Sequence, residues 1–256
     1  MAKVQIPNRS SRFWLSLCLF TFGSNQFTIA AYSQDDAITL MQSARNLYLE
    51  RDFESAEESL RLALDKQSPN TVGYAVGLQN LALLEYLNFH FKESADLYLK
   101  ALALAEPLFG SESSQVANNL YGLSRCLRRM NRFDEVESYL NRLLLIRTKL
   151  FGAQHRLVGN TLLDIAVNCE RQGKYSQAGP FYLKAINSRE LQFGKASIQL
   201  IPVLESYANL LEKKQDLQSS EQVKSRIKDI QDKPGPANFV EARPQNEEDG
   251  SGWQSL

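Results

Sequence analysis

The sequence predicts an all-α fold, a solenoid of about five stacked helical hairpins, and two regularities carry this prediction. The dipeptide Phe-Gly recurs at residues 109–110, 151–152 and 193–194, so each copy follows the last by 42 residues. An aromatic or apolar residue that opens each second helix keeps nearly the same step, and we use it as a marker: Phe53, Phe91, Phe133, Tyr175 and Leu217, spaced 38, 42, 42 and 42 residues apart. A fixed period of this size indicates one supersecondary unit copied in tandem.

Leucine and small residues keep step with these markers in columns. Thirteen places before each marker stands a leucine: Leu40, Leu78, Leu120, Leu162 and Leu204. Nine places before it stands a small residue: Ala44, Ala82, Ser124, Ala166 and Ala208. Small residues let paired helices approach where they cross, and leucines fill the grooves between ridges. A lone hairpin cannot bury its apolar stripe, so we expect the stacked copies to share one core.

Residues 1–33 have the pattern of an export signal. Three basic residues without an acid precede the apolar run 13–22, and the small-residue site that ends at Ser33 follows, so that cleavage there leaves Gln34 first. The run is far shorter than the roughly 20 apolar residues of a spanning helix. We therefore expect an exported protein, periplasmic or secreted, with no stable membrane span after signal removal. Membrane anchoring by an uncleaved signal and an organellar transit peptide are the alternatives.

The repeat array is expected over residues 34–230, and its elements follow in order. Helical patterns run from about 36 to 51 and from 53 to 66, with a tight turn between them. Pro69 interrupts the pattern, and helix resumes over about 72–88. The units fall at about 36–67, 72–110, 111–152, 153–194 and 195–230. Glycine after a long helix fits a left-handed cap, so the Phe-Gly dipeptides mark the junctions between units.

The two ends of the array differ from its middle. Ser43 in the first unit, and Lys224 and Lys228 in the last, stand in columns that are apolar in the other units, as terminal caps require. Residues 231–256 carry five acids against two bases and show no periodicity. We expect a disordered acidic tail there, in which Trp253 is a candidate for a short linear motif.

Several columns resemble the tetratricopeptide repeat signature. The residues that carry the resemblance are Leu81-Ala82, Ile165-Ala166, Gly173-Lys174-Tyr175, Ala178, Tyr182 and Ala185. The 42-residue period is similar to that of the repeats in kinesin light chains, and residues 152–159 resemble the Gly-x-x-His-Pro-x-Val-Ala linker of that subtype, with Arg156 in place of proline. The resemblance covers about residues 36–230. It implies a right-handed superhelix whose first helices line a concave groove.

Charge and composition exclude several other functions. Lys plus Arg and Asp plus Glu both number 29, which leaves no electrostatic footprint for nucleic acid. The scattered His90 and His155 and the cysteines outside the signal, Cys126 and Cys169, give no ligand set with metal spacing, so we expect no metal and no cofactor. Both cysteines are predicted to be small buried side chains, with one disulfide as the alternative. No nucleophile has a base beside it, and no glycine-rich cradle precedes Gly194-Lys195, so an enzyme is not expected.

The resemblance also implies which residues face the groove, namely the second, fifth, ninth and twelfth positions of each unit. In the middle of the array these include the candidate binding residues Leu83, Tyr86, Asn118, Tyr121, Arg125, Arg128 and Asn160. The aromatic and apolar members are candidate anchors, the arginines candidate charge partners, and the asparagines candidate donors and acceptors for a peptide backbone.

The resulting hypothesis is a non-enzymatic protein–protein interaction scaffold. Its groove takes a peptide or protein segment with some acidic character, and its role is assembly or regulation in an exported or cell-envelope setting. A structural or self-associating repeat protein without a peptide ligand is the alternative. Arg125 and Arg128 belong to a run of arginines that is equally typical of a solvated helix face.

Overall fold

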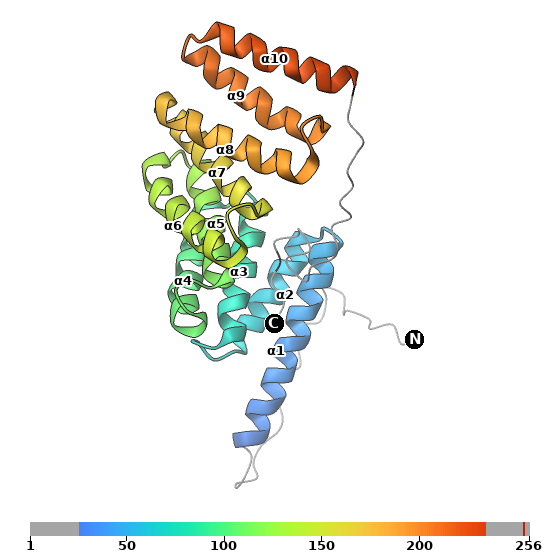
Figure 1. The fold of residues 1–256 in the computed structure, drawn as a ribbon. Coiled ribbons are helices and arrows are strands. Elements are labelled where there is room, and N and C mark those ends of the chain that lie inside the picture. The colour runs from blue at the N-terminus through green and yellow to red at the C-terminus, as the bar shows by residue number, and fades with distance from the viewer. Residues whose placement is uncertain (1–25, 234–252, 254–256) are drawn as a thin grey trace.

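The computed structural model describes residues 26–233 and Trp253, and the helices in this part of the chain form a solenoid (Figure 1). They are α1 (Gln26–Leu49), α2 (Phe53–Asp65), α3 (Val72–Leu87), α4 (Phe91–Phe109), α5 (Ser114–Arg129), α6 (Phe133–Phe151), α7 (Arg156–Arg171), α8 (Tyr175–Phe193), α9 (Ile201–Lys213) and α10 (Leu217–Asp232), with a 3-10 turn η1 (Ile198–Leu200). Consecutive helices pack as antiparallel pairs, α1 with α2 through α9 with α10. The predicted all-α solenoid of five hairpins is confirmed.

Each hairpin turns at the same place, two residues before the marker. The five turn residues all have positive φ, between 59° and 73°: Arg51, Phe89, Asn131, Gly173 and Gln215. The residue that follows each of them donates its N–H to the carbonyl five positions earlier, at N–O distances of 2.8–2.9 Å. This hydrogen bond closes the first helix and sets the entry of the second. Only one of the five is glycine, so this turn has no glycine signature in the sequence.

The Phe-Gly dipeptides end the second helices. Gly110, Gly152 and Gly194 have φ of 84–88° with ψ of 148–156°, a conformation that essentially only glycine adopts. The backbone is thus more extended than the left-handed cap that the sequence suggested. No atom lies within 4 Å of a Cβ built on Gly110 or Gly152, so the backbone conformation alone demands glycine. The three junctions that follow α4, α6 and α8 therefore share one backbone geometry, whereas α2 ends at Asp65 with Lys66 in a right-handed helical conformation.

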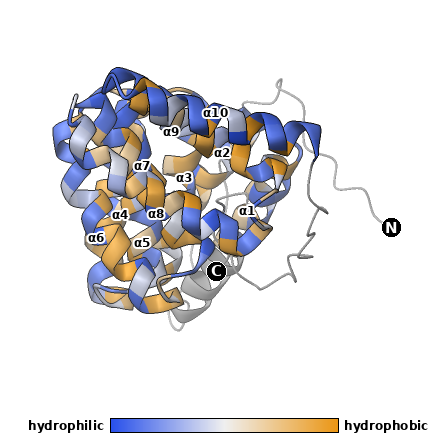
Figure 2. Ribbon diagram, turned by 45° about the horizontal axis from the view of Figure 1, so that its top comes forward, coloured by the Kyte–Doolittle hydropathy of each residue, from blue (hydrophilic) through white to orange (hydrophobic). Residues whose placement is uncertain are grey.

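The columns of small residues lie at the helix crossings. Every member of the column that begins with Ala44 is at most 2% exposed, and the leucine column is buried from Leu78 onward. One continuous apolar core runs from α3 to α10, and a second joins the first hairpin to α3 and α4. Figure 2 shows apolar residues along the helix faces that meet. The repeats thus share a core, as the pattern predicted.

The ends of the array depart from the expected boundaries. Helix α1 begins at Gln26 instead of near Asp36, because no glycine or proline separates them, and it therefore overlaps the end of the predicted signal. The rest of that segment, residues 1–25, lies outside the described residues. Helix α10 reaches Asp232. The last unit opens with η1 because Pro202 lacks the N–H that a continuous helix from residue 198 would use, so α9 starts afresh with Pro202 in its first turn.

Trp253 corrects the expectation of a disordered tail at that residue. Its side chain is buried, 5% exposed, and belongs to the core of the first hairpin. The remainder of the expected tail, residues 234–252 and 254–256, lies outside the described residues. Among the helices that the structure describes, none combines the length and the apolar character needed to cross a membrane.

Candidate functional site

The first helices of the hairpins carry the groove positions. The middle positions on α5 and α7 are partly exposed, and those on α9 are exposed. The exposed α9 positions, Glu205, Asn209 and Glu212, include two acids. The candidate site is therefore the surface over α3, α5 and α7.

A cationic and aromatic cluster lies at the centre of this surface, and we call Tyr86, Tyr121 and Arg125 the Arg125 patch. The Arg125 guanidinium carbon lies 4.2 Å from the centroid of the Tyr86 ring and 5.6 Å from that of Tyr121. Tyr86 comes from α3, and the other two residues come from consecutive turns of α5. A cation held against aromatic faces loses little freedom on binding, because its position is already set.

The environment keeps Arg125 charged. Burial disfavours the cation, but the neighbouring Tyr121 and Tyr86 outweigh it, and together they raise the pKa of Arg125 above its ordinary value. Among the described residues, no carboxylate forms an ion pair with Arg125, although its side chain is only partly exposed. The patch therefore presents a positive charge that the array itself does not neutralise.

Arg147 packs against Tyr121 of the patch, and the groove columns do not predict it. This side chain, on α6, is 3% exposed, and its guanidinium carbon lies 4.8 Å from the Tyr121 ring centroid. It donates to Thr161 Oγ1 at 3.0 Å on α7. Tyr121 thus has guanidinium groups from two helices near its ring. Arg147 lies on the second helix of its hairpin and so outside the groove columns. The sequence signal for it is the substitution of arginine at a position where the preceding unit has Ala105.

Arg128, predicted as a second charge partner, already forms an ion pair within the array. Its Nη1 lies 2.6 Å from Asp164 Oδ1 on α7, and the two side chains are only 23% and 17% exposed. This pair ties the third hairpin to the fourth. The next step is tied by Glu170, which accepts from Tyr182 Oη and Lys213 Nζ, both at 2.6 Å. These groove-column charges join repeats and are not free to bind a partner's charge.

The remaining predicted residues are not gathered at the patch. Leu83 is 5% exposed on α3, so it is not an open anchor. Asn118 is partly exposed on the first turns of α5. Asn160 lines a separate cavity of about 210 Å³ between α7, α8 and the segment before α9, together with Arg156 and Arg189. Of the seven predicted residues, the structure brings Tyr86, Tyr121 and Arg125 together.

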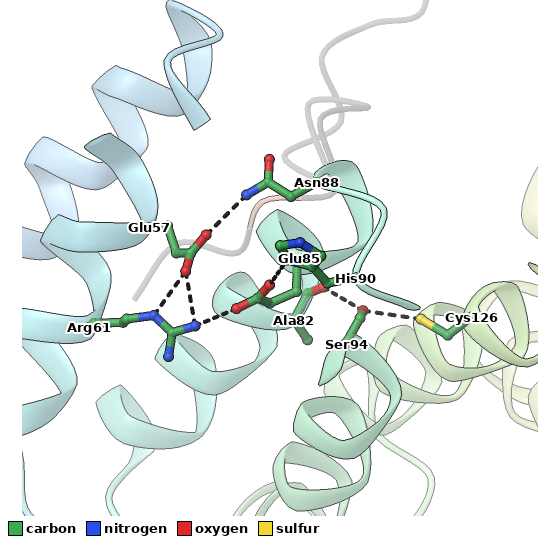
Figure 3. Close-up of polar contacts among 8 residues, drawn as sticks. All are labelled: Glu57, Arg61, Ala82, Glu85, Asn88, His90, Ser94 and Cys126. Carbon is green, nitrogen blue, oxygen red and sulfur yellow. Dashed lines mark hydrogen bonds and ion pairs between the residues drawn. The ribbon is translucent and has the colours of Figure 1, made fainter. Parts of the chain in front are cut away.

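A second polar cluster lies between the first two hairpins and has a structural role (Figure 3). Glu85 on α3, 3% exposed, pairs with Arg61 of α2 and accepts from His90 Nδ1 at 2.8 Å. This hydrogen bond to Glu85 raises the pKa of His90. Glu57 accepts from Asn88 at 3.0 Å and extends the network across the same junction. A buried carboxylate that pairs with an arginine and accepts a hydrogen bond from a histidine is satisfied, so the cluster holds hairpins together.

The histidines and cysteines among the described residues are scattered. No group of three or more His, Cys, Asp or Glu side chains among them can hold a metal ion. Cys126 and Cys169 are both buried and free, as small core side chains, and burial raises the pKa of each thiol. Cys126 Sγ lies 3.1 Å from Ser94 Oγ at a helix crossing.

Comparison with known proteins supports the repeat assignment. A tetratricopeptide repeat family model matches residues 74–144 and 132–191. No curated protein sequence matches this chain. Solved structures do, and they include kinesin light chain-like repeat proteins, so the resemblance seen in the sequence is confirmed.

Three of these structures show how similar the fold is and how low the sequence identity is. A kinesin light chain-like protein of Podospora anserina with nearly identical repeats has a TM-score of 0.67 at 14% identity, covering 78% of this chain and 96% of its own. BtubC of P. vanneervenii has 0.66 at 21% identity, covering 81% and 90%. YrrB, titled a TPR protein with an unusual peptide-binding site, has 0.57 at 15% identity, covering 83% and 94%. At these identities the likeness shows the fold alone.

Proposed function

We propose that this chain, in which residues 74–191 are tetratricopeptide repeats, is a non-enzymatic protein–protein interaction scaffold that binds a segment of a partner in its concave groove. Arrays of this kind bury their apolar stripes between repeats and present one extended concave surface. This surface is typically used to bind other molecules. The peptide-binding site named for YrrB is a precedent on the same fold.

The observation that carries the proposal is the Arg125 patch. Aromatic rings and arginine are the residues that most often dominate binding energy at interfaces, and here they are held together at the centre of the groove. The arginine is cationic and has no carboxylate partner among the described residues, so the patch favours a carboxylate from the partner. The partner is therefore a protein segment with an acidic residue flanked by an apolar or aromatic one.

Ion pairing within the array favours Arg125 over Arg128 in this proposal. Because Arg128 is held by Asp164, Arg125 is the charge partner. Tyr86 and Tyr121 are the packing partners, and Asn118, one turn before Tyr121, is the nearby amide for the partner's backbone. Loss of a central anchor of this type costs about 2 kcal/mol or more, a loss of about 30-fold in affinity.

A matched pair of double variants tests this function. Arg125→Glu with Tyr121→Ala reverses the charge and removes the ring in the patch. Arg132→Glu with Tyr139→Ala makes the same chemical change at the α6 end of the third hairpin, where Arg132 is exposed and paired locally with Glu135. Proteins that co-purify with the wild type are expected to be lost only with the first variant, while both variants keep the wild-type circular dichroism spectrum. If both folded variants retain the co-purifying proteins equally, the proposal that the groove binds a partner loses its support.

We also propose that the protein is exported and acts at the cell envelope or outside it. The basic opening and apolar run of residues 1–33 support this. Cleavage after Ser33 removes the first part of α1 and leaves Gln34–Leu49. The remaining part includes Ala37 and Ala44, which are fully buried within the first hairpin. N-terminal sequencing of the protein from its native source is expected to begin at Gln34. An intact Met1 contradicts cleavage.

A further inference from the structure

We propose that the first hairpin carries a binding site for an aromatic side chain from the C-terminus of this chain, and that Trp253 occupies it in cis. The indole ring centroid lies 5.1 Å from that of Tyr48, at an interplanar angle of 36°, and Tyr48 in turn lies 5.9 Å from Phe53. Trp253 is 5% exposed and belongs to the same apolar core as Met41 and Leu84. Burial of an indole to this degree is a large apolar contact.

The repeat explains why the site exists at the first hairpin. Tyr48 and Tyr86 both stand five places before their markers, and each packs on its marker phenylalanine. In the second hairpin, the face of Tyr86 is covered by Arg125 from the following first helix. At the position equivalent to Arg125, the preceding unit has Leu83, which is shorter and uncharged. The Tyr48 ring takes Trp253 as its neighbour instead.

Burial along α3 is a second, independent observation. Its groove positions Val76, Gln79 and Leu83 are all buried, at 4–6% exposure. The equivalent positions on α5 are partly exposed, although both helices lie inside the array with hairpins on either side. Helix α3 is therefore more deeply buried than the equivalent helix of the next hairpin. Trp253 is the one residue outside the helical array that the structure describes, and it packs in the same apolar core as Leu81 and Leu84 of α3.

Chain length permits docking within one molecule. From Lys233 to Trp253 the chain spans at most about 70 Å when extended. Four steps between neighbouring hairpins, at a helix spacing of about 10 Å, come to about 40 Å. A tethered segment of this kind has an effective concentration in the millimolar range, so modest affinity is enough to hold it. Trp253 thus acts as an internal ligand of the first hairpin, and this holds whether or not the Arg125 patch binds a partner.

Tryptophan fluorescence tests the docking directly. The chain has two tryptophans, so Trp14→Phe makes Trp253 the sole indole emitter. Its emission is expected to be blue-shifted and protected from acrylamide. Tyr48→Ala in this background raises the quenching constant toward that of free N-acetyltryptophanamide, while Tyr207→Ala, which removes a partly buried ring on α9, leaves it unchanged. Quenching of Trp253 like the free amide in the Trp14→Phe protein overturns the proposal.

A peptide experiment with full-length variants separates docking from a folding defect. A fluorescein-labelled peptide of residues 244–256 is expected to bind the Trp253→Ala protein at least about tenfold more tightly than the wild type, because the tethered tail no longer competes. Adding Tyr48→Ala to that variant abolishes the binding. Equal affinity for the wild type and Trp253→Ala contradicts a cis ligand. Protection of Trp253 that is lost on dilution also overturns it, in favour of docking between two copies.

Discussion

A pair of glycine substitutions tests how the hairpins pack. Gly122 on α5 faces the ring of Tyr98 on α4, and a Cβ at residue 122 would lie 2.2 Å from Tyr98 Cζ and 2.4 and 2.6 Å from the two Cε atoms. That ring is 5% exposed and has no open space to enter. Overpacking of this kind costs about 1–3 kcal/mol, and alanine recovers about 1 kcal/mol of helix propensity, so Gly122→Ala is expected to destabilise the fold by up to about 2 kcal/mol.

Gly179 on α8 is the matched control. It also lies inside a helix, and apart from its chain neighbours no atom stands within 4 Å of its Cβ position. The following Pro180 crowds the added methyl and offsets the gain of about 1 kcal/mol in helix propensity, so Gly179→Ala is expected to be nearly neutral. Urea unfolding followed by circular dichroism measures both. Tyr98→Leu should abolish the penalty of Gly122→Ala, because the added methyl then has room. If Gly122→Ala destabilises the protein no more than Gly179→Ala does, α4 and α5 do not approach closely at Gly122.

Three further predictions concern charge and burial. The pKa of His90 is raised in the folded state, so the stability that protonated His90 contributes is fully present below pH 6.5 and is lost as pH rises through the folded-state pKa. The difference in thermal midpoint between wild type and His90→Ala should therefore shrink between pH 6 and 9. Glu170→Ala removes the acceptor of Tyr182 Oη, whose residue is 1% exposed, and should cost about 1–3 kcal/mol in the same urea assay, whereas Glu170→Gln, which keeps an acceptor, costs less. Cys126 and Cys169 are buried with raised thiol pKa values, so a thiol reagent should titrate them only in denaturant; fast reaction of either in the native protein would show that its helix crossing is open.

The columns that set the fold could be predicted because they repeat. A small residue such as Ala82 or Ala166 recurs wherever two helices cross, so the period reveals the packing before any coordinates exist. The Phe-Gly junctions were visible for the same reason, since Gly152 occupies a backbone conformation closed to other residues. The turns inside the hairpins were placed by the markers, although Arg51 and Gln215 there give no local signal of positive φ.

The site was harder to predict because it depends on single residues that do not repeat. The groove columns placed Tyr86, Tyr121 and Arg125 correctly on first helices, but a column does not reveal pairing across repeats. Arg128 and Asp164 lie 36 positions apart, which is neither the period nor a helical spacing, so their ion pair was not foreseen. The contact of Trp253 with the first hairpin joins opposite ends of the chain, beyond the reach of any local pattern.

Site-specific cross-linking tests the central claim, that the Arg125 patch binds a partner segment, most directly. A benzoylphenylalanine at Asn118, one turn from Tyr121 in the groove, is compared with one at Leu145, which is 64% exposed on α6. Irradiation in the native source is expected to give a discrete cross-linked partner from position 118 but not from 145, and Arg125→Glu should abolish it. Cross-linking at 118 that is absent, or unchanged by Arg125→Glu, contradicts the claim.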